Sequence, residues 1–394
     1  MNRRIESLDA LRGLAALSVV IFHCLISFEL FHQANYNEVY TSGLMKFFAE
    51  SPLRLLWAGK EAVLLFFVLS GFVLAIPFMN NRVKSYKDYA LKRFTRIYIP
   101  YICVMIISVI LAMLFLDLKP DLGLSSTYEN RWDHEVSLLA LVSYVLMLNY
   151  DTANVNGVVW TLFHEMRISL IFPIIMFFIM KFKGIKSAVF SFGFTIVAMF
   201  LFYGVAEIFP IEVVGQVIDN FGDSFYYALF FVAGALLSKY RDVITSALSS
   251  KSAVYRFILF IVAIMLISYK WMYNFIDFSG TPLTDFIPGI GILILFAVTL
   301  SSSLMDRILT LKPLLWLGKI SYSLYLTHVI VIMICTILLS NFMPVAYTFV
   351  IAIALSLPVA HITYKLFEEP SIAIGRKITK KSRVPNKHIE KAVP

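Results

Sequence analysis

An arginine and a histidine, Arg12 and His23, stand eleven residues apart in the first hydrophobic segment of the chain. Eleven residues make almost three turns of an α-helix, so both side chains share one helical face, roughly 16 Å apart along the axis. An ionisable side chain near the middle of a bilayer is costly and marks a functional site by default. Neutral imidazole can take a proton from a hydroxyl group, so His23 is a candidate general base. The structural alternatives are a topological arginine paired with Asp9 one turn earlier, and a histidine bonded to a neighbouring helix.

Two further arginines, Arg93 and Arg96, stand at the beginning of the third apolar segment. Their spacing of three places them side by side on one face of a helix. Two guanidinium groups in this arrangement suit recognition of phosphate or carboxylate, which makes the pair a candidate anion site at the cytoplasmic mouth. The alternative is that the pair only anchors the chain at the cytoplasmic surface, as the rest of its basic loop does.

A glutamate and a second histidine also lie within apolar runs. Glu165 is expected about two turns below the outer surface, where an unpaired carboxylate is costly, so we expect Arg167 or a histidine as its partner. His328 stands about ten residues from the inner end of its segment, again near mid-depth. His23, Glu165 and His328 could therefore converge on one buried cavity. The structural alternatives are a buried ion pair for Glu165 and a hydrogen bond within the helix bundle for His328.

The composition indicates whether these residues lie in a soluble or a membrane-embedded protein. The chain has 394 residues, of which 59% are hydrophobic and 15% charged, and its mean hydropathy is +0.80. A soluble domain carries about 25% charged residues, so the sequence indicates a membrane-embedded protein. The three cysteines show no disulfide framework and no metal-binding spacing, and we expect no metal. Motifs for nucleotide phosphates, covalent serine chemistry and zinc proteases do not occur.

Apolar runs of membrane-spanning length recur along the chain and predict an all-α polytopic protein. We expect about ten transmembrane helices, near residues 11–30, 54–79, 95–117, 158–180, 187–206, 222–239, 253–271, 285–304, 317–339 and 345–367. The apolar run 136–149 is too short to span and better suits a re-entrant or interfacial helix. The first run is expected to act as an uncleaved signal anchor.

The distribution of lysine and arginine agrees with the predicted topology. With ten spans and both termini cytoplasmic, most of the 34 lysines and arginines fall in cytoplasmic segments. The net charge of +9 is therefore a topology signal, and we expect no nucleic-acid partner. We predict one transmembrane domain over residues 1–370, followed by a basic cytoplasmic tail, 371–394, that lies against anionic membrane lipids.

Taken together, these residues resemble the acyltransferase-3 family of polytopic membrane acyltransferases. Six motifs of that family match in order along almost the whole chain: Arg-x10-His at Arg12–His23, Phe-Phe-x-x-Ser-Gly-Phe at Phe66–Phe72, Arg-x-x-Arg at Arg93–Arg96, Trp-Thr-Leu-x-x-Glu at Trp160–Glu165, Ile-Ser-Tyr-x-Leu-Tyr-x-x-His at Ile320–His328 and Phe-Glu-Glu-Pro at Phe367–Pro370. One departure is Met166, which stands where many relatives carry a second acidic residue.

The resemblance implies transfer of an acyl group, usually acetyl, from cytoplasmic acyl-CoA to a hydroxyl of a carbohydrate or lipid-linked glycan, in a bacterial cytoplasmic membrane. By the same resemblance, His23 would be the general base or a transient acyl carrier, and Arg12 would steer or stabilise charge. Glu165 would orient a histidine or contact the acceptor, and Arg93 and Arg96 would grip the phosphates of coenzyme A. Further candidates to line the cavity are Asp9, Ser70, Trp160, His164, Tyr325 and His328.

The main alternative is a secondary transporter of a small anion or sugar, with Arg12, His23 and Glu165 as a relay. Transporters commonly show internal repeats, and we find none here. A membrane acyltransferase of the unrelated type that also buries a histidine would leave Arg93 and Arg96 unexplained. Many relatives carry a further hydrolase-like domain, whereas about 25 residues follow the last span here. We therefore expect the protein to complete the transfer itself or to hand it to a separate partner.

Overall fold

The computed structural model describes residues 3–209, 211–276 and 278–381, and the regular elements in these ranges are all helical. Within them, nine helices are long and apolar enough to cross a membrane. These helices are α1 (Arg3–Leu25), α4 (Lys60–Met79), α5 (Tyr86–Phe115), α9 (Trp160–Lys181), α10 (Ile185–Ala206), α11 (Glu212–Ser249), α13 (Leu283–Ser301), α15 (Lys312–Leu339) and α16 (Val345–Thr363). The predicted all-α polytopic fold is confirmed.

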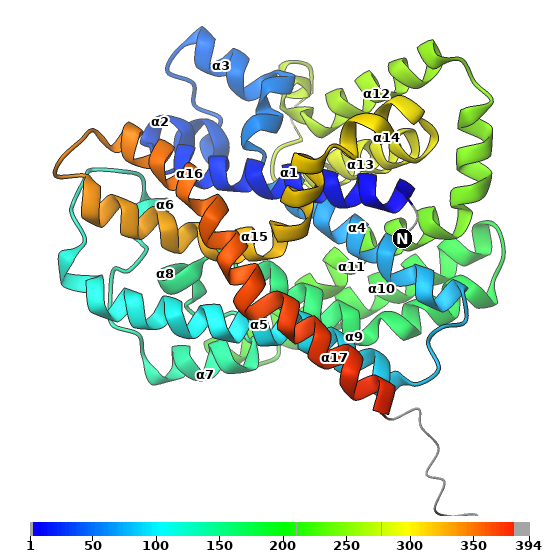
Figure 1. The fold of residues 1–394 in the computed structure, drawn as a ribbon, viewed down its shortest axis with the longest axis horizontal. Helices are drawn as coiled ribbons and strands as arrows, with labels where there is room; N and C mark the ends of the chain where they lie inside the picture. The colour runs from blue at the N-terminus through cyan, green and yellow to red at the C-terminus, as the bar shows by residue number, and fades with distance from the viewer. Residues whose placement is uncertain (1–2, 210, 277, 382–394) are drawn as a thin grey trace, which may run out of the picture.

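Shorter helices connect the long ones (Figure 1). They are α2 (Glu29–His32), η1 (Gln33–Asn37), α3 (Gly43–Glu50), η2 (Pro52–Trp57), η3 (Leu116–Leu118), α6 (Ser126–Glu129), α7 (Leu138–Leu146), α8 (Thr152–Asn156), α12 (Ala253–Ile267), η4 (Tyr269–Asn274), α14 (Ser303–Leu309), η5 (Tyr364–Glu368) and α17 (Glu369–Lys381).

One predicted span, 253–271, is shorter than expected, because α12 has only 15 residues. The segment begins just after Ser249, whose hydroxyl donates to the carbonyl oxygen of Ser301 at the end of α13. It continues into η4, where Nζ of Lys270 donates to the carbonyl oxygen of Asn35, beyond the end of α1, at 2.7 Å. Together α12 and η4 therefore connect the two ends of the bundle. We expected ten membrane-spanning helices and the described residues contain nine long enough to span. The difference is this one segment, because α12 is too short to be counted.

The apolar run 136–149 forms α7, a helix of nine residues. The hydroxyl of Ser137 accepts a hydrogen bond from the backbone of Ala140 at its start, and Met147 ends it in a left-handed conformation with φ of 55°. Nine residues rise about 14 Å, less than half the hydrocarbon thickness. The prediction that this run does not span the membrane is confirmed.

Two pairs of glycines let the central helices cross at close range. Gly13 on α1 lies against Gly318 on α15, and a Cβ atom on either would overlap the backbone of the other helix. Gly71 on α4 and Gly234 on α11 form a second crossing of the same kind. Small residues at such crossings are typical of membrane bundles. The first crossing places Arg12 against the beginning of α15.

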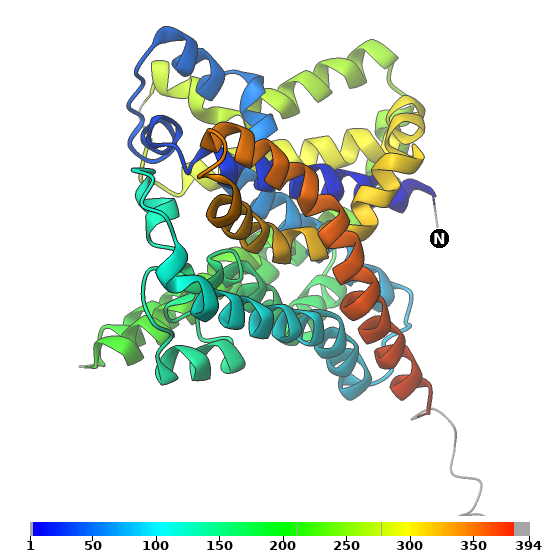
Figure 2. The ribbon, with the colours of Figure 1, turned by 60° about the vertical axis from the view of Figure 1, so that its left-hand side comes forward.

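The last span continues without a break into the segment that follows it. The π-helical segment η5 joins α16 to α17, and Gly375 of α17 packs against Thr95 of α5. Both ribbon views place the start of α1 and the end of α17 toward the same side of the molecule (Figures 1 and 2). The predicted tail 371–394 is helical as far as Lys381, and its remainder lies outside the described residues. The domain boundary at residue 370 stays a prediction.

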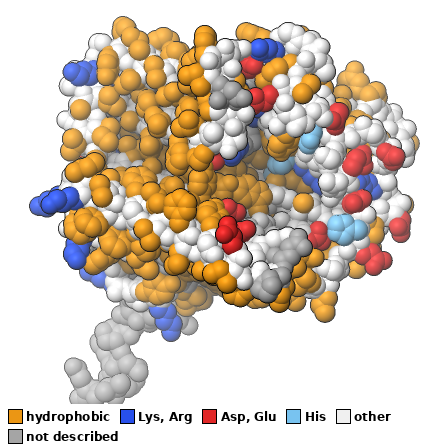
Figure 3. Space-filling view, turned by 180° about the vertical axis from the view of Figure 1, so that it is seen from behind, with side chains coloured by type: hydrophobic (Ala, Val, Ile, Leu, Met, Phe, Trp, Pro, Cys, Tyr) orange, Lys and Arg blue, Asp and Glu red, His pale blue; other side chains and the backbone are white. Residues whose placement is uncertain are grey.

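Hydrophobic side chains cover the broad middle of the surface that Figure 3 shows. Several lysine and arginine side chains lie at its left edge, and a few others lie near its top and within its right half, where most of the acidic and histidine side chains gather. A membrane-crossing bundle with one basic side has this distribution. The assignment of the basic side to the cytoplasm stays a prediction.

Candidate active site

Two cavities enter the helix bundle toward its opposite ends and share part of one wall. The arginine cavity has a volume of about 860 Å³, including the solvent at its mouth, and is lined among others by Arg12, Ser70, Arg93, Arg96, Glu165 and Glu368. The histidine cavity has a volume of about 1300 Å³, measured in the same way, and is lined among others by His23, Arg54, Glu61, Trp160, Tyr269 and Lys270. Val63 and Tyr325 line both cavities and form the shared wall.

Arg12 is held at the crossing of α1 and α15. Its Nε donates to the hydroxyl of Ser321 at 2.9 Å, and its Nη2 donates to the carbonyl oxygen of Gly318 at 3.1 Å. The same Nη2 lies 3.1 Å from Oδ1 of Asp9, as expected for an ion pair one helical turn apart. These contacts fix the guanidinium at the wall of the arginine cavity. Asp9 itself lines neither cavity.

Arg93 and Arg96 lie near the beginning of α5, and both line the arginine cavity. Among the residues that the structure describes, neither guanidinium forms a hydrogen bond or an ion pair. Arg93 also lines an adjoining pocket of about 680 Å³, whose wall includes Arg82, Lys84 and Lys92. Two guanidinium groups without an ion pair, beside a basic pocket, are suited to binding a polyanion, although Glu165 and Glu368 line the same cavity.

Glu165 faces the arginine cavity, where its Oε1 accepts a hydrogen bond from the hydroxyl of Ser70 at 3.2 Å. Neither of the expected partners, Arg167 or a histidine, forms a hydrogen bond or an ion pair with Glu165 in the described parts of the chain. Arg167 instead donates to the carbonyl oxygens of Asn220 and Met147. Two residues along a helix turn the side chain by about 200°, so Arg167 points away from Glu165.

A second carboxylate of the arginine cavity, Glu368, comes from the π-helical segment η5. Its Oε2 accepts a hydrogen bond from the hydroxyl of Ser323 at 2.7 Å, and only 6% of the residue is exposed. Single π-helical turns occur frequently at functional sites. The closing sequence motif contained this residue, but spacing alone did not place it in the site.

His23 lies in the histidine cavity, where a loop arginine contacts it. Nη2 of Arg131 is 3.0 Å from Nδ1 of His23, and Arg131 is 4% exposed. Burial lowers the pKa of Arg131 to about 10, so the guanidinium keeps its proton at neutral pH. A guanidinium can only donate, so Nδ1 of His23 accepts and its neutral ring carries the proton on Nε2.

His328 is fully buried directly beside His23, with 5.2 Å between the two ring centroids. Its Nδ1 lies 3.1 Å from the carbonyl oxygen of Leu324, an acceptor, so the proton of the neutral ring is on Nδ1. Its Nε2 therefore carries a lone pair, and this atom has no hydrogen-bond partner in the described parts of the chain. The two rings have complementary tautomers, with an N–H on Nε2 of His23 and a lone pair on Nε2 of His328.

The expectation of one cavity for His23, Glu165 and His328 is wrong: only His23 lines the histidine cavity, and His328 is buried beside it without lining either cavity. Glu165 lies in the arginine cavity, because five residues of α9 separate it from Trp160, which lines the histidine cavity. Five residues rise about 7.5 Å along a helix, enough to pass the shared wall. His164 lines neither cavity, and its Nδ1 lies 2.9 Å from the hydroxyl of Ser224.

Sequence reasoning missed the charged residues that line the histidine cavity, namely Glu38, Arg54, Lys60, Glu61 and Lys270, and it also missed Arg131, which contacts His23. Arg131 belongs to a loop, where a charged residue is ordinary and carries no signal. Arg54 and Glu61 fell inside the predicted span 54–79, and its charged beginning was the available signal. Among the described residues, no group of histidine, cysteine and acidic side chains is arranged to hold a metal ion.

Comparison with known proteins gives a consistent result. Residues 5–365 match the family model described as an acyltransferase domain, Acyl_transf_3. The chain is 23% identical to the peptidoglycan O-acetyltransferase OatA of Listeria monocytogenes over 94% of its length, and 24% identical to the putative peptidoglycan O-acetyltransferase YrhL of Bacillus subtilis over 94%. It is also 24% identical to the O-acetyltransferase OatA of Staphylococcus aureus over 93%. The aligned regions cover 56%, 55% and 57% of these relatives, so the chain spans about half their length. No solved structure is significantly similar.

Proposed function

Since this chain belongs to the acyltransferase-3 family, we propose that it transfers an acetyl group from acetyl-CoA to a hydroxyl group of a carbohydrate. Relatives with a named substrate are described as peptidoglycan O-acetyltransferases, which makes a glycan of the cell envelope the first candidate acceptor. The proposed donor is cytoplasmic. We therefore propose a location in the bacterial cytoplasmic membrane, with the arginine cavity open to the cytoplasm.

One observation carries this proposal: two arginines without an ion pair line a cavity that shares a wall with the cavity that His23 lines. Coenzyme A has phosphates at one end and a narrow, flexible thiol arm at the other. The pocket beside Arg93 suits the phosphates, and the arginine cavity suits the arm. A donor bound in this way directs its thioester toward Tyr325, with the acceptor approaching from the histidine cavity.

In the proposed reaction the acceptor oxygen attacks the thioester carbonyl carbon. An ester C–O bond forms, the C–S bond breaks, and the proton lost by the hydroxyl is taken up by the leaving thiolate. The tautomers of the two histidines favour a different catalytic role for each ring. The N–H on Nε2 of His23 is suited to stabilise the oxyanion, and the lone pair on Nε2 of His328 is suited to receive the hydroxyl proton in transit. The expected role of His23 as a base would require Arg131 to release Nδ1.

Binding and turnover can be separated with purified protein in lipid nanodiscs. We expect CoA binding to be lost in an Arg93→Ala/Arg96→Ala variant and kept in His23→Gln and His328→Gln, with turnover of labelled acetyl-CoA lost in all three. A matched control is Arg241→Ala/Arg307→Ala, which removes two arginines that line neither cavity. Absence of CoA binding in folded wild-type protein would refute the donor. Glycan transport without CoA binding would favour the transporter instead.

A further inference from the structure

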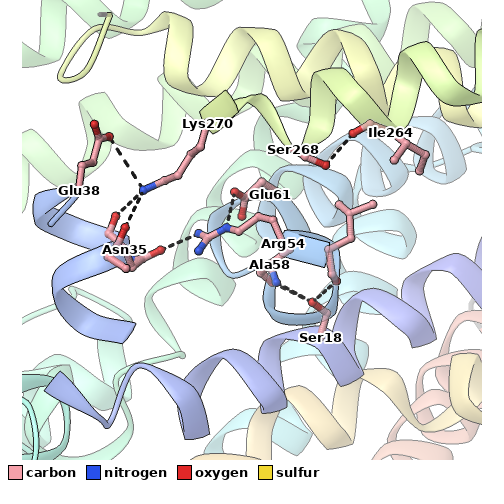
Figure 4. Close-up of polar contacts among 11 residues, drawn as sticks. Ser18, Asn35, Glu38, Arg54, Ala58, Glu61, Ile264, Ser268 and Lys270 are labelled. Atoms are coloured by element: carbon pink, nitrogen blue, oxygen red, sulfur yellow. Dashed lines mark hydrogen bonds and ion pairs between the residues drawn. The ribbon is translucent and has the colours of Figure 1, made fainter. Parts of the chain in front are cut away.

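The histidine cavity contains a buried charge network that the proposed chemistry does not use (Figure 4). Nε of Arg54, in η2, lies 3.3 Å from Oε1 of Glu61, at the beginning of α4, and the two residues are 2% and 3% exposed. Nη2 of Arg54 also donates to Oδ1 of Asn35 at 2.6 Å. Lys270 donates to the carbonyl oxygen of Asn35 at 2.7 Å and lies 4.0 Å from Glu38. The network joins segments that follow α1 to the beginning of α4 and to η4.

Two charged atoms of this network have no partner. Nη1 of Arg54 and Oε2 of Glu61 are buried and make no hydrogen bond to any residue that the structure describes. Both residues line the histidine cavity. Buried polar atoms are almost always paired in native proteins, and a charged one is expensive to leave unpaired. Because Arg54 and Glu61 also line the cavity, a ligand or a water molecule seated against these side chains would supply the missing hydrogen bonds.

The charges of the wall indicate what kind of ligand fits. Among the described residues, each lysine and arginine that lines this cavity has a carboxylate partner: Glu61 lies 3.3 Å from Arg54, Asp285 lies 2.7 Å from Lys60, and Glu38 lies 4.0 Å from Lys270. The arginine cavity differs, because Arg93 and Arg96 have no ion pair there. Arg131, which contacts His23, forms no ion pair with any described residue, but it does not line the cavity. The lining itself therefore offers no surplus charge to hold a phosphate or a carboxylate. It favours an uncharged polar ligand.

Aromatic rings form much of the remaining wall of the histidine cavity. They include Phe22, Tyr36, Trp160, Tyr227, Tyr269 and Tyr273. Such rings combine a flat apolar face with a polar edge, and pockets built from them orient a ligand through a few polar groups. A pyranose ring matches this wall, because its faces carry C–H groups and its rim carries adjacent hydroxyls.

We propose that Arg54 and Glu61 form the acceptor subsite and bind two adjacent hydroxyls of an uncharged pyranose. Nη1 of Arg54 donates to one hydroxyl oxygen, and Oε2 of Glu61 accepts the hydrogen of the next. The inference rests on the proposed function, in which a carbohydrate hydroxyl is acylated, and it adds the class of sugar and the residues that select it. His23 lines the same cavity, so a sugar held there lies on the side of the histidine pair.

The preference for an uncharged sugar can be measured by titrating the protein in nanodiscs with methyl β-glucopyranoside and with methyl β-glucopyranosiduronate, which differs by a carboxylate. Tryptophan fluorescence reports binding, because Trp160 lines the cavity. We expect wild-type protein to bind the uncharged glycoside at least about tenfold more tightly. In Glu61→Gln the guanidinium of Arg54 loses its counter-charge, so the preference should reverse toward the uronide.

The matched control is Glu50→Gln, a carboxylate of the neighbouring helix α3 that does not line the cavity. It should keep the wild-type preference. A purely structural network would weaken both glycosides equally in Glu61→Gln and would not reverse their order. Equal weakening, unchanged binding in Glu61→Gln, or wild-type protein that prefers the uronide or binds neither glycoside would each overturn the subsite.

A second variant decides the matter if Glu61→Gln does not fold. Arg54→Met/Glu61→Leu replaces the buried pair with apolar side chains, a change that buried ion pairs often tolerate. It should lose glycoside binding and keep CoA binding in the arginine cavity. Retained glycoside binding would overturn the subsite. Failure of wild-type protein to bind CoA would refute the proposed function separately, because the glycoside titration does not depend on the donor.

Discussion

Replacing Arg131 with leucine tests whether a loop residue controls His23, the histidine proposed to take part in catalysis. The substitution removes the donor that lies 3.0 Å from Nδ1 of His23 and leaves that nitrogen buried without it. A hydrogen bond to a charged group contributes about 1.5–3 kcal/mol, and 1.4 kcal/mol corresponds to a factor of ten. If that free energy holds the tautomer in the transition state, kcat should fall between roughly tenfold and a hundredfold.

Two measurements separate this role from a general loss of structure. CoA affinity should not change, because Arg131 does not line the arginine cavity. Nitrogen-15 chemical shifts of labelled histidine should show one tautomer of His23 in wild-type protein and a mixture in Arg131→Leu. Arg131→Lys keeps a cationic donor and should recover part of the activity.

The reasoning would be refuted by wild-type kcat in Arg131→Leu, or by a single unchanged tautomer of His23 together with reduced kcat. A parallel loss of CoA affinity and kcat would indicate a damaged fold instead. Each result implies a different role for Arg131 at His23. The kinetic measurements and the histidine chemical shifts are therefore needed together.

Two further perturbations follow from the packing of the bundle. Gly13→Ala places a methyl group into the backbone of α15 and should lower stability by about 1–3 kcal/mol in thermal unfolding, whereas Gly193→Ala, with no atom within 4 Å of the added methyl, should be neutral. Equal unfolding temperatures for the two variants would contradict the close crossing. Tyr325→Ala opens the shared wall, so water should reach the thioester and CoA release without an acceptor should rise, while Tyr325→Phe keeps the ring and should not show this. Unchanged CoA release in Tyr325→Ala would show that another group keeps water out.

Local spacing predicted the parts of the site that depend on one helix. Arg12 pairs with Asp9 one turn earlier, and Arg93 and Arg96 line one cavity, because helical periodicity alone decides both arrangements. The all-α fold and the short α7 likewise follow from the length of apolar runs.

Relations between distant segments could not be predicted in the same way. Whether Glu165 shares a cavity with His23 depends on the depth at which α9 passes α1, and an error of a few residues moves a side chain across the shared wall. The contact between Arg131 and His23 joins residues 108 positions apart, through a loop with no periodic signal. The pair of Arg54 and Glu61 was hidden because both residues fell inside one predicted span.

The wall formed by Val63 and Tyr325 has an electrical consequence. The two cavities approach each other from opposite ends, so when water fills them only a thin layer of side chains insulates one from the other. Most of a transmembrane voltage then falls across this layer, and 100 mV is worth about 2.3 kcal/mol for each elementary charge that moves through it. In the proposed reaction the acetyl group would cross such a layer as a neutral unit. A proton that crosses with it would do electrical work, which would couple the reaction rate to the membrane voltage.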